Sequence, residues 1–141
     1  MLNTDKFFWD ALRTDASVTK ATGGRIFNTA RPTIEEKQDR VPYVIITFDS
    51  LTNDETTKDD EAESPYDSVN VSILCVANDR EQLARLTQAV RDRNKEYMLD
   101  KGDSYGIEDW QFSAGAVMYD ELKPCFYQTL SYNVTTCNDI T

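Results

Sequence analysis

The fold is decided by residues 68–90, which read SVNVSILCVANDREQLARLTQAV. In the first half, apolar residues occupy alternate positions from Val69 to Cys75, which is the period of two that a β-strand with one buried face produces. In the second half, Leu83, Leu86 and Val90 recur at the spacing of an amphipathic helix. The stretch therefore predicts a strand over about 68–77 that leads directly into a helix.

The predicted helix carries its own start signal and a set of arginines. Asn78 can cap it, and Glu81 follows three residues later at the spacing of a capping box. Glu81 is also placed to pair with Arg85 one turn on, while Arg91 and Arg93 point in other directions. These arginines suit either a solvated helix face or a contact with acidic groups of another subunit.

A second strand precedes this unit, and a strongly acidic segment joins the two. Val44, Ile46 and Phe48 alternate with their neighbours, which predicts a strand that forms a hairpin with residues 68–77. The segment 50–67 between them is expected to be a long, mobile arm, because its acidic residues cannot enter a core. Its carboxylates are Asp54, Glu55, Asp59, Asp60, Glu61 and Glu63. We interpret the segment as a solvated acidic arm. Weak binding of a divalent cation is an alternative, although the segment lacks the glycine and the terminal glutamate of a calcium-binding loop.

The remaining elements complete an α+β domain that spans residues 1–141. An aromatic-rich helix is predicted from Asp5 to Arg13 with Thr4 as its cap, and Arg25–Phe27 is too short for more than a bridging strand. Two further strands are predicted over 110–116 and 126–134. The predicted fold is a single α+β domain in the order helix-strand-strand-helix-strand-strand, with an antiparallel sheet of about four strands and two helices packed on one face.

Composition indicates a folded protein that avoids nucleic acid. Hydrophobic residues make up 40% of the 141 residues, and the formal net charge is -10. Phosphate binding needs clustered Lys and Arg, so sequence-specific nucleic-acid binding is not expected. We expect no secretory signal and no membrane-spanning segment, because no basic start with an apolar run and no apolar stretch of about 20 residues occurs. The expected compartment is the cytoplasm.

Chemistry-bearing residues are sparse. The chain contains no histidine, which removes Ser-His and Cys-His nucleophilic schemes and the commonest general base. Cys75, Cys125 and Cys137 are odd in number and widely spaced, so reduced thiols are expected, with Cys75 buried on the apolar face of its strand. We therefore predict no catalytic residue, no metal site and no cofactor, and an enzyme that uses carboxylates or a thiol remains only as a residual hypothesis.

Short motifs along the chain resemble those of a known family. They are the aromatic first helix, Gly24-Arg25-Ile26-Phe27, Val41-Pro42-Tyr43-Val44-Ile45-Ile46, Val69-Asn70-Val71-Ser72-Ile73-Leu74 before the Asn78 helix, and the strand around Tyr127 to Val134. In these the chain resembles the tail-terminator or tail-completion (head-tail joining) proteins of long-tailed phages and their prophages. The resemblance implies a non-enzymatic virion protein that forms a ring, of six subunits by expectation. It further implies that the ring caps the tail tube and offers a docking surface to the head connector.

The resemblance also implies where the protein works and which partners it meets. It would be made in the host cytoplasm during assembly and then reside in the virion, at the head-tail junction. Its partners would be copies of itself, the tail-tube protein and the head-connector protein, through the acidic arm and the exposed arginines Arg85, Arg91 and Arg93. An acidic channel wall would repel DNA and let it slide.

The charge also motivates a hypothesis from a different function class. An acidic binding module, such as a nuclease inhibitor or DNA mimic, would use the carboxylates between Asp54 and Glu63 to occupy a basic surface on its partner. Charge reversal on the arm separates the two hypotheses, because only the acidic module depends on those charges to bind a nuclease or a DNA-binding protein.

Overall fold

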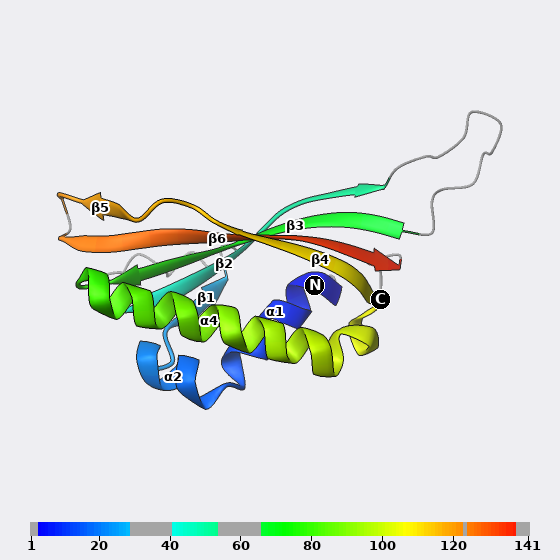
Figure 1. Ribbon diagram of the computed structural model, residues 1–141, viewed down its shortest axis with the longest axis horizontal. Helices are drawn as coiled ribbons and strands as arrows, with labels where there is room; N and C mark the ends of the chain where they lie inside the picture. The colour runs from blue at the N-terminus through cyan, green and yellow to red at the C-terminus, as the bar shows by residue number, and fades with distance from the viewer. Residues whose placement is uncertain (1–2, 29–40, 54–65, 123, 138–141) are drawn as a thin grey trace.

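The computed structural model describes residues 3–28, 41–53, 66–122 and 124–137. Within this part of the chain lie three α-helices, one 3-10 helix and six strands (Figure 1). In chain order they are α1 (Asn3–Arg13), α2 (Ala16–Thr22), β1 (Ile26–Asn28), β2 (Tyr43–Asn53), β3 (Tyr66–Ala77), α4 (Arg80–Lys101), η1 (Gly102–Tyr105), β4 (Ile107–Ala114), β5 (Met118–Asp120) and β6 (Cys125–Cys137).

The strands form one mixed sheet in the order β1-β2-β3-β6-β4. All pairs are antiparallel except β1 with β2, which run parallel. β5 pairs with the first residues of β6, while β4 pairs with the later ones, so β4 and β5 follow one another along the same edge of β6. Gly115 lies between them and donates its N–H to the Thr129 carbonyl at 2.9 Å, which keeps the interrupted edge strand attached.

The predicted strand count and element order were wrong because of three short elements. α2 and β5 were not predicted, and β1 was predicted to be no more than a bridging strand. α2 begins after Asp15, whose carboxylate accepts a hydrogen bond from Val18 N at 3.0 Å, and ends at Gly23 with φ 63°. Threonine and valine are poor helix formers, so the composition of α2 does not predict a helix. Its capping residues at both ends are the signal that does. β1 and β5 have three residues each, too few for a periodic signal.

Two predicted helix starts also shift by one or two residues. α1 begins at Asn3, so Thr4 lies inside its first turn. α4 is capped by Asp79, not Asn78: the Asp79 carboxylate accepts from Gln82 N at 2.7 Å, and the Gln82 side chain accepts from Asn78 N at 2.8 Å. The cap therefore lies one residue later than predicted, and the Gln82 side chain accepts from the residue before the cap in place of the cap itself.

The predicted acidic arm lies mostly outside the described residues. β2 continues through Asn53 and β3 begins at Tyr66, so both strands extend into the segment 50–67. Residues 54–65 are not described, and the arm stays a prediction.

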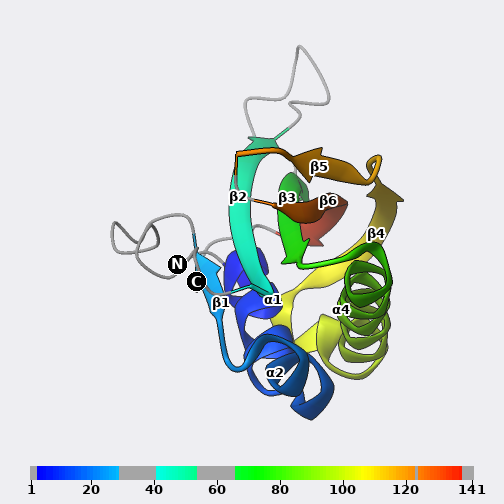
Figure 2. The same ribbon diagram turned by 90° about the vertical axis from the view of Figure 1, so that its left-hand side faces the viewer.

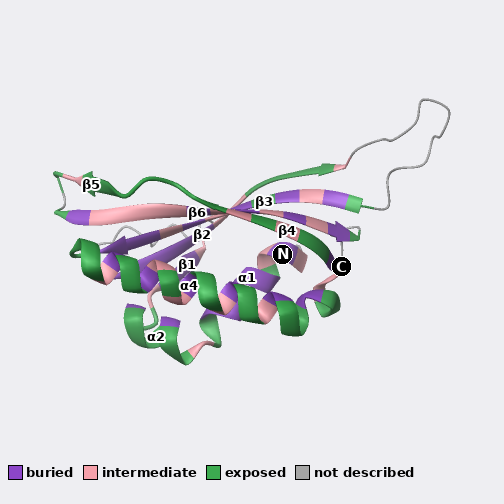
Figure 3. Ribbon diagram, in the orientation of Figure 1, coloured by how far each residue is buried: buried purple, intermediate pink, exposed green. Residues whose placement is uncertain are grey.

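The main core lies between the sheet and the helices, which all lie on one side of it (Figures 1 and 2). β3 and β6 supply alternate buried residues, seen as alternating colours in Figure 3, and α1 and α4 supply the opposing layer. Phe7 and Phe8 are completely buried on α1, where Phe7 contacts the rings of Tyr97 and Tyr105 and Phe8 contacts Tyr132. The buried face of α4 consists of Leu83, Leu86, Val90, Asn94 and Met98.

A smaller apolar cluster lies on the opposite side of the sheet, at the end where β2 and β6 begin. Its buried members are Phe27, Tyr43, Ile45, Val76 and Cys125. One row of cross-strand neighbours continues the cluster toward the β5 edge, and it consists of Tyr43, Val76, Tyr127 and Met118. The face of the sheet that points away from the described helices is thus apolar at one end.

Candidate functional site

The rest of this sheet face, opposite the described helices, carries rows of polar side chains across β2, β3, β6 and β4. The strand register places Asn70 beside Asn133 and Ser72 beside Ser131, and β4 adds Gln111 and Ser113 to the same two rows. We call this surface the polar sheet face, and it consists of Asp49, Asn70, Ser72, Gln111, Ser113, Ser131 and Asn133. It arises because every second residue of these strands is polar while the alternate residues fill the core.

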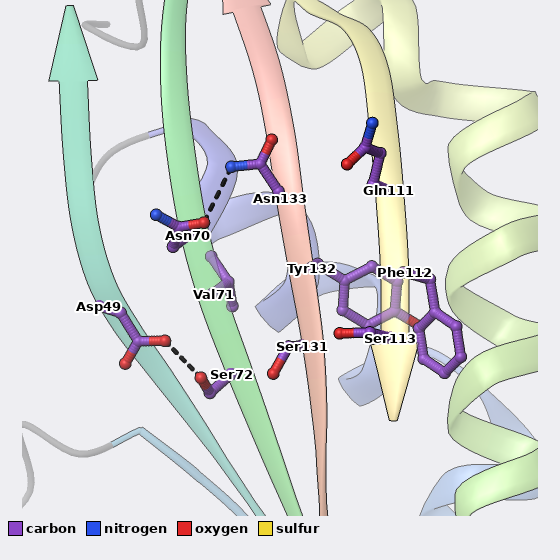
Figure 4. A pocket seen from close by; sticks show the side chains of 10 residues that line it. All are labelled: Asp49, Asn70, Val71, Ser72, Gln111, Phe112, Ser113, Ser131, Tyr132 and Asn133. Atoms are coloured by element: carbon purple, nitrogen blue, oxygen red, sulfur yellow. Dashed lines mark hydrogen bonds between the residues drawn. The ribbon is translucent and has the colours of Figure 1, made fainter. Parts of the chain in front are cut away.

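A shallow depression of about 360 Å³ crosses the polar sheet face (Figure 4). The Ser72 hydroxyl donates to the Asp49 carboxylate, and Asn133 donates to the Asn70 side-chain carbonyl at 2.8 Å. Asn70 in turn donates to the Ser50 hydroxyl at 3.0 Å. These side chains therefore hold one another in place and present amide and hydroxyl groups to water.

Two titratable groups, Tyr132 and Cys75, lie in the core between the sheet and the helices, and the pKa of each is raised. Burial raises the pKa of Tyr132 to about 12, although the hydrogen bond from Asn94 opposes this shift. Burial likewise raises the pKa of the Cys75 thiol to about 12, so that the thiol is protonated at neutral pH. The expectation that Cys75 is buried is confirmed. Within the described ranges no three Cys, Asp or Glu side chains gather as metal ligands.

The arginines predicted to make contacts occupy two flanks of α4. Arg85 and Arg93 line one depression of about 390 Å³ between α2 and α4. Arg91 lies on the other flank, where its guanidinium is 4.5 Å from the centre of the Phe112 ring on β4. The six arm carboxylates, from Asp54 to Glu63, lie outside the described residues.

Arg93 and Arg85 differ in what they contact. Arg93 donates to the Ala11 carbonyl at 2.8 Å and to the Thr14 hydroxyl at 3.0 Å, so it satisfies a carbonyl at the end of α1. Its side chain is 16% exposed, against 71% for Arg85, which pairs with the exposed Glu81 at 3.3 Å. Arg93 therefore joins α1 to α4, and Arg85 is accessible to a partner.

This difference predicts unequal effects on stability. Arg93→Ala should lower the free energy of unfolding by about 1 to 2 kcal/mol, because it removes charged hydrogen bonds to a helix end. Arg85→Ala is the matched control on the same helix and should change it by no more than about 0.5 kcal/mol, since exposed ion pairs contribute little. Urea denaturation followed by circular dichroism measures both, and equal losses would contradict the assignment.

The hairpin of β5 and β6 is an exposed apolar surface that the sequence analysis did not single out. Val117, Met118, Tyr119 and Leu122 are all exposed there. The Tyr119 ring packs on Phe126 with their centroids 4.9 Å apart, and the Asp120 carboxylate accepts from Leu122 N at 3.0 Å, directly after β5. The apolar run Val117–Tyr119 followed by Leu122 was the available signal, although a short strand next to a turn gives no periodicity.

No helix in the described part of the chain has the length and apolar character needed to cross a lipid bilayer.

Comparisons with known proteins identify the fold. No family model matches the sequence, and no curated protein matches it. A chain of a solved structure described as the virion of a native gene transfer agent (GTA) particle aligns with a TM-score of 0.60 and 12% identity, over 94% of this chain and 92% of that chain. A crystal structure of a protein from Akkermansia muciniphila aligns over 67% of this chain and 44% of that chain, at 19% identity and a TM-score of 0.29. The first likeness shows one fold over nearly the whole of both chains.

Proposed function

We propose that this chain is a structural, non-enzymatic component of a phage-like particle, and that it is the tail-terminator or tail-completion subunit. The observation that supports the proposal most is the likeness in fold to a chain of a gene transfer agent virion, which extends over 94% of this chain. In this role a ring of subunits, six by expectation, caps the completed tail tube and joins it to the head connector. The protein would assemble in the host cytoplasm and remain in the virion at the head-tail junction.

The polar sheet face suits a surface past which DNA must move. Among the described residues that line its depression there is no Lys or Arg, while Asp49 contributes a negative charge. Affinity for duplex DNA comes largely from cations that neutralise phosphates, so this face offers DNA little to bind. Its amide and hydroxyl groups keep it hydrated, and the net charge of -10 adds a general repulsion of phosphate.

The exposed arginine Arg85 and the acidic arm supply the proposed contacts to neighbours. Arg85 and Arg91 lie on two flanks of α4, so they can meet different surfaces, whereas Arg93 would first have to release its contacts with α1. The arm carboxylates from Asp54 to Glu63 belong to the same proposal. Together these charges would set the orientation of a subunit against its partners.

Binding to tail-tube ends tests the function. The purified protein, mixed with tail tubes of its own particle and viewed by negative-stain electron microscopy, should add density at one end of each tube. Replacing the six arm carboxylates by Asn and Gln should reduce the fraction of capped ends, while neutralising the exposed Glu108 and Asp109 on β4 serves as the control. Absence of end binding by the unmodified protein, or decoration along the tube, would contradict the proposal. Tight binding to a basic nuclease instead would favour the acidic inhibitor.

A further inference from the structure

The outer edge of β4 carries backbone groups that no strand in the described part of the chain pairs with. β4 is the last strand in the order β1-β2-β3-β6-β4, and Figure 2 shows it at the border of the sheet. Directly after β4, Gly115 donates its N–H to the Thr129 carbonyl and so faces β6. Because backbone groups alternate in direction along an antiparallel ladder, the N–H and C=O groups of Trp110, Phe112 and Ala114 point to the outer edge.

The second half of this edge lacks the usual protection against pairing. Edge strands are commonly protected by charged side chains, by proline or by a bulge. β4 has these only at its beginning, where the register shifts between Ile107 and Asp109 and where Glu108 and Asp109 are exposed. Residues 110–114 read WQFSA, with no charge and no proline, and both aromatic side chains are only half-buried. This half is therefore suited to pair with another strand.

α4 places positive charge beside the same edge. The Arg91 guanidinium lies 4.5 Å from the centre of the Phe112 ring, and Arg91 lines one depression of about 150 Å³ together with Phe112 and Ala114. The helical repeat groups five residues on this flank of α4, and they are Arg80, Ala84, Thr87, Arg91 and Lys95. None of the five is acidic. α4 packs against β3 and β6, which leaves β4 as the border of the sheet.

We propose that the β4 edges of two copies of this chain pair in antiparallel orientation, about a two-fold axis that passes beside Gln111. Gln111 is the centre of the stretch 108–114, so this register pairs the whole strand after the first residue. Trp110 of each copy then lies opposite Phe112 of the other, and residues that lie opposite one another point to the same face. The helices of both copies therefore lie on one side of a continuous sheet, and the aromatic rings form two cross-strand pairs.

Charge complementarity identifies a second copy as the partner of this edge. In the same register Glu108 of the second copy lies opposite Ala114, which shares its depression with Arg91. The acidic beginning of one β4 thus meets the cationic flank of the other α4, and the two-fold axis repeats this contact. The pair closes on itself, because both copies use the same edge. It does not rest on the proposed tail function, since it describes the protein before it meets a particle.

A disulfide on the two-fold axis tests the contact. In a Cys137→Ser background, which removes the exposed thiol, Gln111→Cys would face its own mate in a non-hydrogen-bonded pair, with Cα atoms about 4.5 Å apart. Mild oxidation should convert most of the protein to a covalent dimer and to nothing larger, measured by non-reducing electrophoresis and native mass spectrometry.

Ser113→Cys in the same background is the matched control. It is exposed on the same strand and the same sheet face as Gln111, but its mate would be displaced along the strand by roughly 13 Å, too far for a disulfide. Alone it should stay monomeric under the same oxidation. Mixed with the Asp109→Cys variant it should cross-link, because the register places Ser113 opposite Asp109 of the second copy.

A charge swap tests the partner of Arg91 without any cross-link. Arg91→Glu should raise the dissociation constant of the dimer at least about tenfold, because it brings a second carboxylate toward Glu108. Arg91→Glu combined with Glu108→Arg should restore the parent affinity. Within one subunit these positions lie beside opposite ends of β4, so restoration reports a contact between copies. Arg85→Glu, on the other flank of α4, should leave the affinity unchanged. Sedimentation equilibrium gives the constants, and matching circular dichroism spectra show that the variants are folded.

The possible results separate this contact from the proposed function. A Gln111→Cys variant that gives no covalent dimer, equal cross-linking of Ser113→Cys, or products larger than two chains would each overturn the contact. A double charge swap that binds as weakly as Arg91→Glu would overturn it too. A Gln111-specific dimer with affinity restored by the swap supports the contact even where tube ends are not bound, so that failure of the tail function leaves it standing.

Discussion

Leu83→Ala should lower the free energy of unfolding by about 2 to 5 kcal/mol, the range for a buried leucine that is truncated to alanine. Leu83 is 1% exposed on the face of α4 that packs against the sheet. The substitution removes apolar area from the core and leaves a cavity that the rigid sheet cannot close. A loss of this size can exceed half the total stability of a small domain.

Leu99→Ala is the matched control for this prediction. Leu99 lies on the same helix but is 77% exposed, so the chemical change and the helix propensities are identical while burial differs. It should change stability by no more than about 0.5 kcal/mol. Urea titration of both variants gives the comparison, and a small loss at Leu83 would show that α4 does not pack on the sheet as described.

Tyr132→Phe should lower the free energy of unfolding by about 1 to 3 kcal/mol, because it leaves the buried amide of Asn94 without the hydroxyl that it contacts. Asn94 Nδ2 donates to the Tyr132 hydroxyl at 3.2 Å, and both residues lie in the core between α4 and β6. Asn94→Leu should also destabilise, since it leaves the Tyr132 hydroxyl buried with its amide partner gone. The double variant Asn94→Leu, Tyr132→Phe should recover most of the loss, because two apolar groups can replace a buried polar pair.

A double-mutant cycle measures this coupling. The sum of the two single effects should exceed the effect of the double variant by about 1 kcal/mol or more. Tyr119→Phe provides the control, because the Tyr119 side chain is half exposed and loses only a hydroxyl that water can reach. Strict additivity within the cycle would exclude the pair as a coupled unit.

Tyr132 should also make the stability of the protein fall at alkaline pH. The folded protein raises the pKa of Tyr132 from 10.0 to about 12, mainly through burial, so the folded state holds the proton more tightly than the unfolded chain. The resulting stability is fully present below pH 10 and is lost as the pH rises toward 12. Tyr132→Phe should therefore weaken the dependence of stability on pH within this window, while the buried Cys75 thiol keeps its own contribution.

The parts of the fold that the sequence predicted are those with a long periodic signal. The alternation from Val69 to Cys75 and the helical repeat of Leu83, Leu86 and Val90 identified β3 and α4, since burial of one face imposes each period. The same reasoning missed Asn94, because a polar residue at a core position breaks the pattern and only its partner Tyr132, far along the chain, explains it.

The short elements and the surfaces were harder to predict for physical reasons. β5 is held by pairing with β6 and not by its own residues, so nothing local marks Met118–Asp120 as a strand. Arg93 and Arg85 look equivalent in the sequence, and only the approach of the end of α1 distinguishes them. Leu122 is apolar and exposed, a combination that the sequence cannot separate from an ordinary core leucine.

The pairing of β3 with β6 determines when the domain can fold. These strands are neighbours at the centre of the sheet, with Ile73 opposite Leu130, yet α4, β4 and β5 all lie between them in the chain. Non-local pairing of this kind slows folding, because a long loop must close before its contacts are gained. During translation the β2–β3 hairpin would appear first and wait with one edge of β3 unpaired until β6 emerges. A nascent chain that stops before Cys125 lacks the buried residues Leu130, Tyr132 and Val134, so it would be a target for chaperones and proteases and not a subunit ready to assemble.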